Sequence, residues 1–300
     1  MDLKIETSKS IRPASTVVLV REQDQGLQVY LLKRSSGSGF FPGSYVFPGG
    51  ALNPDEGEVD FWQQHLDLRP KDLLGVFGSG LDRAALIAFG VAAIRETFEE
   101  AGVFLARKKK ESPDSFRGIG ERPPTGKLDE GWLRRKVLDE GWMLSFSNLF
   151  PWSHWITPAV MPKRFDTRFF IALMPEGQEC LPDDRETVHG LWVSPEKGLQ
   201  ENSQGRIPLS PPTLITLHEL LKFGTLPSLR QEIHSRSWGD PRQPIQIIFD
   251  QGVVIVQPWD PYYGNPVKID PEGLKEKIIP VGESFSRLWL DQGIWRPVGI

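Results

Sequence analysis

The sequence predicts an α+β fold with mixed strands, and two observations support this class. Runs rich in β-branched and aromatic residues recur along the 300 residues and are bounded by glycine, proline and polar turn residues, which is typical of strands. Apolar residues at helical spacing lie between those runs, most clearly over 82–101. With 39% hydrophobic and 25% charged residues, the chain can bury a full core as one large domain or two modest ones.

The N-terminal part predicts a hairpin followed by a structured loop. The β-rich runs 15–22 and 27–34 are joined by a turn, Asp-Gln-Gly. The next segment packs glycine, serine and proline around aromatic residues and ends in a short strand near 45–47. Gly49 and Gly50 follow, and because they lack side chains they let the backbone approach a neighbouring group closely.

Two helices are expected next. Residues 59–74 predict a helix with a polar surround. The longer helix over 82–101 begins at Asp82, which can cap it, and Gly102 can terminate it. Residues 105–128 are charged and rich in proline and glycine, which indicates a mobile loop.

Strands and helices interleave in the second half. Patterns of both kinds predict a helix over 128–140, strands over 149–158, 167–175 and 189–195, and a helix over 212–224. After a short helix, two alternating runs follow, and each is broken by an Asp-Gln-Gly turn, so two hairpins are expected. We therefore expect a first domain over 1–225 and a β-rich C-terminal extension over 226–300.

Composition excludes several classes of function. The net charge is −4 and the pI about 5.8, so no global field draws the protein to nucleic acid or to an anionic membrane. The sequence contains no run of about 18 apolar residues, so no membrane span is predicted. The N-terminus lacks a signal-peptide core, which favours the cytoplasm. The single cysteine, Cys180, excludes an internal disulfide framework and a cysteine-rich metal site.

The stretch AAIRETFEEAGVF at 92–104 carries the clearest chemical signal. On a helix it places Glu96, Glu99 and Glu100 three and four positions apart, and like charges at that spacing are destabilising. Solvent, Arg95 or a bound divalent cation must neutralise them, and such a cation prefers hard oxygen ligands.

The order of a strand, a Gly-Gly loop and this acidic helix resembles the Nudix hydrolases. That family's box runs Gly, five residues, Glu, seven residues, then Arg-Glu-hydrophobic-x-Glu-Glu-x-Gly-hydrophobic. Gly50 and Glu56 match its first part, Thr97 replaces the usual hydrophobic residue, and the second part is matched by Arg95, Glu96, Glu99, Glu100, Gly102 and Val103.

The middle of the box departs from the family pattern. Between Glu56 and Arg95 lie 38 residues rather than seven, so about 31 are inserted, over about 57–88. Such an insertion resembles the branch of the mammalian peroxisomal coenzyme A diphosphatases, as does the segment WITPAVMPKRFDTRFF at 155–170. The segment at 31–50 is also similar to a motif associated with coenzyme A hydrolysis in other Nudix enzymes, although its interior arginine is missing.

The resemblance implies a fold and an activity. The fold is a mixed-sheet α/β/α sandwich with an insertion inside the box. The activity is metal-dependent hydrolysis of a diphosphate linkage, with coenzyme A or acyl-coenzyme A as the leading substrate and 3',5'-ADP and a 4'-phosphopantetheine as products. Alternatives are cleavage of ADP-ribose, NADH or a dinucleoside polyphosphate, or a non-catalytic nucleotide-binding module. Partners are then small nucleotide-derived molecules, and a homodimer is a candidate assembly.

The chemistry also follows from the residues. Water must reach a phosphorus atom shielded by negative oxygens, and a divalent cation neutralises that charge and lowers the pKa of the water. The carboxylates of Glu96, Glu99 and Glu100, with the carbonyl of Gly50, are the expected ligands of Mg²⁺ or Mn²⁺. Arg95 is expected to hold a carboxylate in place by paired hydrogen bonds.

Candidate substrate contacts lie in two segments. Arg34 and Gly49 flank the glycine-rich loop, where Arg34 either contacts phosphate or pairs structurally. The second segment offers Lys163, Arg164 and Arg168, and Arg164, Asp166 and Arg168 would share one face of a strand. A ladder of ion pairs is therefore the alternative to phosphate binding there. Aromatic rings beside both segments could stack an adenine, namely Phe40, Phe41, Tyr45, Trp152 and Trp155, although such rings mostly fill cores.

Overall fold

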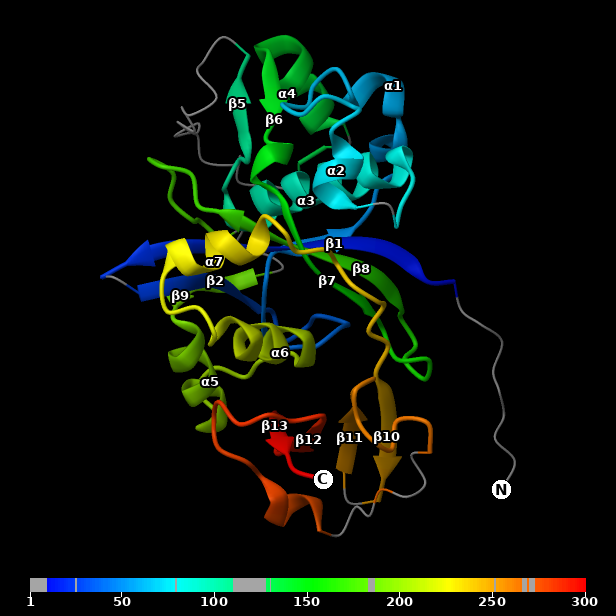
Figure 1. Cartoon of the computed structure of the whole chain (residues 1–300), viewed down its shortest axis with the longest axis vertical. Coiled ribbons are helices and arrows are strands. Elements are labelled where there is room, and N and C mark those ends of the chain that lie inside the picture. The colour runs from blue at the N-terminus through cyan, green and yellow to red at the C-terminus, as the bar shows by residue number, and fades with distance from the viewer. Residues whose placement is uncertain are drawn as a thin grey trace.

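A mixed sheet crosses the middle of the molecule, with helices on both of its faces (Figure 1). The computed structural model describes residues 10–24, 26–78, 80–109, 128–129, 131–182, 187–250, 252–265, 269 and 273–300. The sheet has the order β3-β2-β1-β8-β7, with β4 added to β1 and β9 added to β2. Its strands are β1 (Arg12–Gln23), β2 (Gly26–Arg34), β3 (Tyr45–Val46), β4 (Gly49–Ala51), β7 (Phe150–Ile156), β8 (Phe165–Leu173) and β9 (Thr187–Val193).

Strand β1 organises this sheet. On one side it runs parallel to β8 along most of its length. On the other side its second half forms the predicted hairpin with β2, where Val20 pairs with Val29, and its first half pairs with β4, where Ser15 faces Gly50. Because β2 and β4 pair with different halves of the same side of β1, the two loop glycines lie where the sheet divides.

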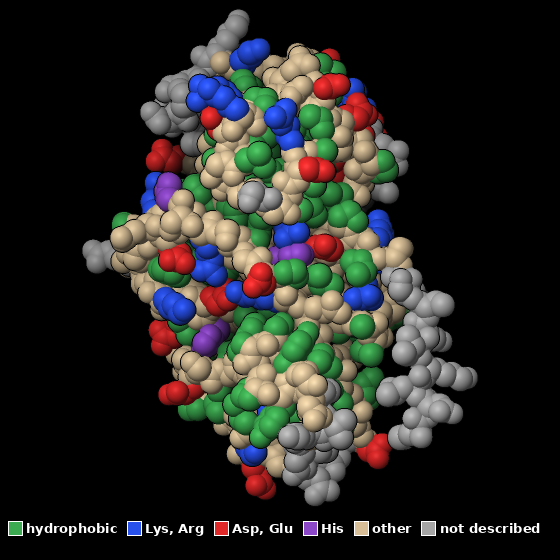
Figure 2. Space-filling model, turned by 45° about the vertical axis from the view of Figure 1, so that its right-hand side comes forward, with side chains coloured by type: hydrophobic (Ala, Val, Ile, Leu, Met, Phe, Trp, Pro, Cys, Tyr) green, Lys and Arg blue, Asp and Glu red, His purple; other side chains and the backbone are tan. Residues whose placement is uncertain are grey.

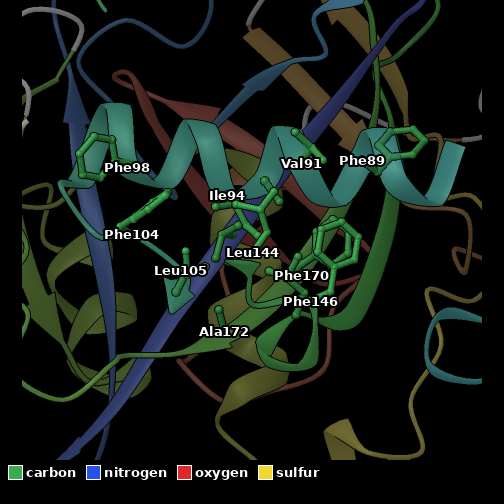
Figure 3. Packing of buried hydrophobic residues seen from close by; sticks show 14 of the residues in the cluster. Phe89, Val91, Ile94, Phe98, Phe104, Leu105, Leu144, Phe146, Phe170 and Ala172 are labelled. Atoms are coloured by element: carbon green, nitrogen blue, oxygen red, sulfur yellow. The ribbon is translucent and has the colours of Figure 1, made fainter. Parts of the chain in front are cut away.

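Helix α3 (Arg83–Ala101) covers one face of the sheet and confirms the predicted long helix. Asp82 caps it by accepting a hydrogen bond from the Ala85 amide at 2.8 Å, and Gly102 ends it in the left-handed conformation, at φ 70°. Its inner side projects Phe89, Val91, Ile94 and Phe98 toward residues of the sheet and its neighbours (Figure 3). This apolar packing fixes the helix, and its last turns carry the glutamates.

The insertion is not one helix, so the expected helix over 59–74 is wrong in its extent. Within 59–74, where the structure describes every residue, the helical segments are α1 (Val59–Trp62) and the start of α2 (Leu73–Phe77). The backbone between them pairs elsewhere: Leu144 donates to the carbonyl of His65 at 2.7 Å and accepts from the amide of Asp67 at 3.0 Å. A strand-like contact thus replaces helical hydrogen bonds. The apolar side chains of the insertion enter the main core, namely Trp62, Leu66, Leu73 and Phe77.

The segment after α3 also differs from its prediction. Residues 110–127 of the expected loop lie outside the described residues, but Ala106–Lys108 forms β5, antiparallel to β6 (Trp142–Leu144). The predicted helix that follows is α4 (Trp132–Glu140). On the other side of the sheet, α6 (Pro211–Leu220) was predicted, whereas α5 (Pro195–Ser203) was missed.

After α7 (Leu226–Ile233), the two predicted hairpins form and join into one antiparallel sheet (Figure 1). Its strands are β10 (Ile245–Phe249), β11 (Gly252–Val256), β12 (Arg287–Asp291) and β13 (Ile294–Val298). One face buries its own small core around Val254 and Trp289. The opposite face places Ile255, Leu288 and Trp295 in the same core cluster as residues of β1 and α6. The extension therefore packs on the body of the protein.

The distribution of charged side chains on the surface agrees with the modest net charge of −4. On the face drawn in Figure 2, basic and acidic side chains lie interspersed among apolar and polar ones. Within the described residues, every helix is too short or too polar to cross a membrane.

Candidate active site

A cavity of about 960 Å³ opens beside the last turns of α3, where β4 leaves β1. Among the parts of the fold that line it are α3 with its carboxylates, the Gly-Gly strand β4, the floor made by β1 and β8, and a wall from the C-terminal extension. A space of this size accommodates a ligand as large as a dinucleotide or a drug-sized molecule.

Arg95 gathers the acidic residues at one end of this cavity. Its Nε donates to Glu56 at 2.6 Å, and one terminal nitrogen donates to Glu96 at 2.7 Å and to Glu99 at 2.9 Å. The other terminal nitrogen donates to the carbonyl of Ala51 at 2.9 Å. Arg95 was expected to hold a carboxylate by paired hydrogen bonds, but it instead makes one hydrogen bond to each of three carboxylates. Because Glu56 lies before the insertion, this contact also closes the interrupted box.

Burial sets the electrostatics of the cluster. The pKa of Glu96 is raised to about 7, chiefly by desolvation. Arg95 lowers this pKa, whereas repulsion from Glu99 and Glu56 raises it further. Desolvation also raises the pKa of Glu56 above its ordinary value despite its ion pair. For Arg95, burial alone would lower the pKa, but the carboxylates around it raise the net value. The site thus holds more negative charge than its single arginine neutralises, which fits a site for a cation.

Both glycines of the loop touch this cluster. The amide of Gly49 donates to Glu100 at 2.9 Å. A Cβ on Gly50 would lie 2.3 Å from a carboxylate oxygen of Glu96, and a Cβ on Gly49 would lie 2.4 Å from the backbone oxygen of Ser15. At Gly49 the obstacle is backbone, so only glycine fits there, whereas a side chain at Gly50 would force the Glu96 carboxylate to move.

Two tryptophans in the cavity wall were missed by sequence reasoning. The indole of Trp132 donates to the second oxygen of Glu99 at 2.6 Å, and its ring lies 4.9 Å from that of Phe98. Trp62 of the insertion donates to the carbonyl of Asp55 and also lines the cavity. Trp132 opens the predicted helix after the acidic one, but no local pattern indicates that it reaches back to Glu99.

Neither predicted arginine of the basic segment lines the cavity, and the alternation along β8 explains this for Arg168. Alternate residues Phe165, Thr167 and Phe169 face the cavity. Arg168 therefore points to the opposite face, where its guanidinium lies over the rings of Phe89 and Trp238 at 5.7 and 5.4 Å. Burial lowers the pKa of Arg168, as expected for a cation enclosed by apolar rings.

Apart from Arg95, the basic side chains that line the cavity come from segments outside β8. Arg164 donates to the carbonyl of Thr157 at 3.3 Å and does not line the cavity. Of the predicted cations, Lys163 and Arg34 line the wall, and Arg12 joins them there. Of the aromatic candidates for stacking, Phe40, Phe41 and Trp155 line the cavity; the rings of Phe40 and Phe165 are 5.5 Å apart.

The acidic cluster has the donor chemistry of a hard divalent cation. Among the described residues, no three His, Cys, Asp or Glu side chains converge on one point that could hold a metal ion. The reason is local: Arg95 draws Glu96 and Glu99 to itself, and Glu100 accepts from Gly49. The oxygens are nevertheless carboxylates on one helix end beside a backbone loop, the ligand types that magnesium and manganese prefer.

Comparison with known proteins supplies the family. A family model described as the NUDT19 Nudix domain matches residues 7–220, most of the chain. The chain belongs to this Nudix family. It is a Nudix hydrolase, and such hydrolases generally need a divalent metal ion.

Relatives agree with this assignment. The chain is 27% identical to the acyl-coenzyme A diphosphatase NUDT19 of Homo sapiens over 305 residues, covering 88% of this chain and 81% of the human protein. It is 28% identical to the protein of the same name from Gallus gallus over 292 residues, covering 84% of this chain and 76% of that one. The crystal structure of a Nudix hydrolase from Alicyclobacillus acidocaldarius superposes with a TM-score of 0.62 at 24% identity, covering 77% of this chain and 99% of the other, and confirms the Nudix fold.

Proposed function

We propose that this Nudix hydrolase cleaves the diphosphate linkage of coenzyme A or acyl-coenzyme A, giving 3',5'-ADP and 4'-phosphopantetheine or its acylated form. The observation that carries the proposal is the carboxylate cluster around Arg95 at one end of a cavity of about 960 Å³. The similarity to acyl-coenzyme A diphosphatases along most of the chain supports the substrate class.

The residues of the acidic end would hold the metal and position the reaction. Glu96, Glu99 and Glu100, with the carbonyl of Gly50, are the proposed ligands of Mg²⁺ or Mn²⁺. When bound, the ion supplies charge neutralisation at the diphosphate and a lower pKa for the attacking water. Arg95 fixes the orientation of two of these carboxylates, and the amide of Gly49 fixes that of Glu100.

The rest of the cavity would position the nucleotide. Lys163, Arg34 and Arg12 place positive charge along the wall, where phosphate groups of the substrate can pair with them. Phe40 and Phe41 offer ring faces for an adenine, with ring centroids 4.5 Å apart. Cations and rings in one wall match the two chemical parts of an adenosine phosphate.

A panel of diphosphates tests the proposal. Purified protein with Mg²⁺ or Mn²⁺ is incubated with coenzyme A, 3'-dephospho-coenzyme A, an acyl-coenzyme A, ADP-ribose, NADH and a dinucleoside polyphosphate, and products are identified by mass. We expect 3',5'-ADP from coenzyme A and its acyl form, with no turnover after chelation of the metal. Cleavage of ADP-ribose or NADH at much higher kcat/KM than coenzyme A would assign the enzyme to the alternative substrates instead.

Two finer expectations belong to the proposal. The enzyme is expected to act in the cytoplasm, which a fluorescent fusion with a peroxisomal marker tests. A homodimer is the candidate assembly, which light scattering of the purified protein tests by molar mass.

A further inference from the structure

The C-terminal extension reaches into the cavity. Its four strands lie outside residues 7–220, the part matched by the family model. In β10 and β11, Gln246 pairs directly with Ile255, and both residues line the cavity, as does Pro244 just before β10. The extension therefore supplies part of the wall that encloses the substrate.

Alternation along β10 explains which residues reach the cavity. Ile245, Ile247 and Phe249 pack against the extension's own core around Val254. Gln246 and Ile248 therefore share the other face. Gln246 is half-buried in the cavity wall, whereas Ile248, two residues further on, is 70% exposed and does not line the cavity.

The chemistry of this wall differs from that of the other walls. The charged residues of the cavity belong to β1, β2, α3, the 53–56 segment, Asp129 and the segment containing Lys163. The lining residues from the extension are a proline, an amide and an isoleucine, and the neighbouring N-terminal end of α6 adds Ser210, Pro211, Pro212 and Thr213. This wall offers no cation to a phosphate, so it suits the part of a substrate that carries no charge.

We propose that the wall formed by Pro244, Gln246 and Ile255 binds the acyl chain of an acyl-coenzyme A and thereby sets the preference for chain length. This inference rests on the proposed diphosphatase function. The chain is the extended apolar part of such a substrate, and its burial against Ile255 and the prolines removes apolar surface from water. Gln246, opposite Ile255, sets how much room the chain has.

Substitutions at Gln246 test this wall, with Ile248 as the matched control on the same strand and face. Values of kcat/KM are measured for free coenzyme A and for its acetyl, octanoyl and palmitoyl thioesters. Gln246→Trp fills the space and is expected to lower the palmitoyl-to-free ratio about tenfold or more. Gln246→Leu, which removes polarity at similar size, is expected to raise that ratio. Ile248→Trp adds the same ring outside the cavity and is expected to leave the ratio unchanged.

The outcomes separate the two proposals. An unchanged ratio in both Gln246 variants, with free coenzyme A still hydrolysed, overturns the acyl wall and leaves the diphosphatase function standing. A wild-type protein that hydrolyses neither free nor acylated coenzyme A overturns the diphosphatase function, and the acyl wall with it. Thermal melts establish that each variant is folded, and if Gln246→Trp does not fold, the ratio for Gln246→Leu alone decides.

Discussion

The indole nitrogen of Trp132 donates to Oε1 of Glu99 at 2.6 Å, while Arg95 donates to Oε2 of the same carboxylate at 2.9 Å. Glu99 is the most exposed member of the cluster around Arg95, with 28% of its side chain accessible, so two donors from different helices hold a group that solvent would otherwise let rotate. Trp132 is therefore a positioning residue for a proposed metal ligand.

Trp132→Phe removes this hydrogen bond and keeps the ring against Phe98. A hydrogen bond to a charged group contributes about 1.5 to 3 kcal/mol, so we expect kcat to fall about tenfold or more and the concentration of Mg²⁺ needed for half-maximal rate to rise. Trp142→Phe is the control, because its indole also donates to a carboxylate, that of Glu140 at 3.0 Å, outside the cavity. Equal kinetic losses in the two variants would contradict the positioning role.

Glu100→Gln keeps the size of the side chain and removes its charge. If the carboxylate is a metal ligand, turnover at saturating Mg²⁺ should fall by several hundredfold while the melting temperature changes little. Glu96→Gln and Glu99→Gln are expected to behave alike. Wild-type turnover by the Glu100→Gln protein would rule out its assignment as a ligand.

The two loop glycines should fail in different ways when changed to alanine. At Gly50 the added Cβ meets the carboxylate of Glu96 at 2.3 Å, and this side chain can turn away, so Gly50→Ala should lose activity and remain folded. At Gly49 the obstacle is the backbone of Ser15 and Thr16, so Gly49→Ala should disturb the pairing of β4 with β1 and lower the melting temperature as well. Melts and initial rates of both variants, measured side by side, test the distinction.

Lys163→Ala and Arg168→Ala compare a basic residue that lines the cavity with one that points away from it. Lys163 lines the cavity, so its loss should raise KM for coenzyme A several-fold at nearly unchanged stability. Arg168 lies over Phe89 and Trp238, so its loss should lower stability by about 1 to 2 kcal/mol and leave KM unchanged. A selective effect of Arg168→Ala on KM would restore the phosphate-binding role first predicted for it.

Asp260 makes the stability of the C-terminal sheet depend on pH. Burial raises its pKa, but hydrogen bonds from Arg287, Ser286 and the Tyr262 amide outweigh this, so the net pKa lies below the ordinary 3.8. A carboxyl with a depressed pKa stabilises the fold at pH values above its unfolded-state pKa, and the contribution is lost as pH falls below about 4. Asp260→Asn should therefore cost about 2 kcal/mol at pH 7 and much less near pH 3. Urea unfolding of both proteins at the two pH values measures this, and a constant difference would contradict it.

Local signals predicted α3 and its carboxylates well. Asp82 and Gly102 mark the helix ends through backbone chemistry within a few residues, and the glutamates follow from helical spacing. Gly50, Glu56 and Arg95 were recognised as parts of one interrupted box, and the structure brings Glu56 and Arg95 together at 2.6 Å.

The features that the sequence did not predict depend on contacts between segments far apart in the chain. The helix over 59–74 breaks because the backbone around Leu66 pairs with Leu144, a contact with no local signature. Period-two alternation placed Asp166 and Arg168 on one face of β8, although Arg164 lies just before that strand, and it does not say which face is turned to the cavity. The contributions of Trp132 and Gln246 likewise depend on elements that meet only in the folded chain.

The parallel pairing of β1 with β8 bears on how this enzyme acquires activity during folding. Arg12 lies opposite Phe165 and Val20 opposite Leu173, so each pair closes a loop of about 150 residues, which is entropically costly and slow. Helix α3 has local stop and start signals and can form early, before the floor of the cavity exists. On dilution from denaturant, the helical circular dichroism signal should therefore recover ahead of diphosphatase turnover, and the delay should reflect the time taken to bring β1 and β8 together.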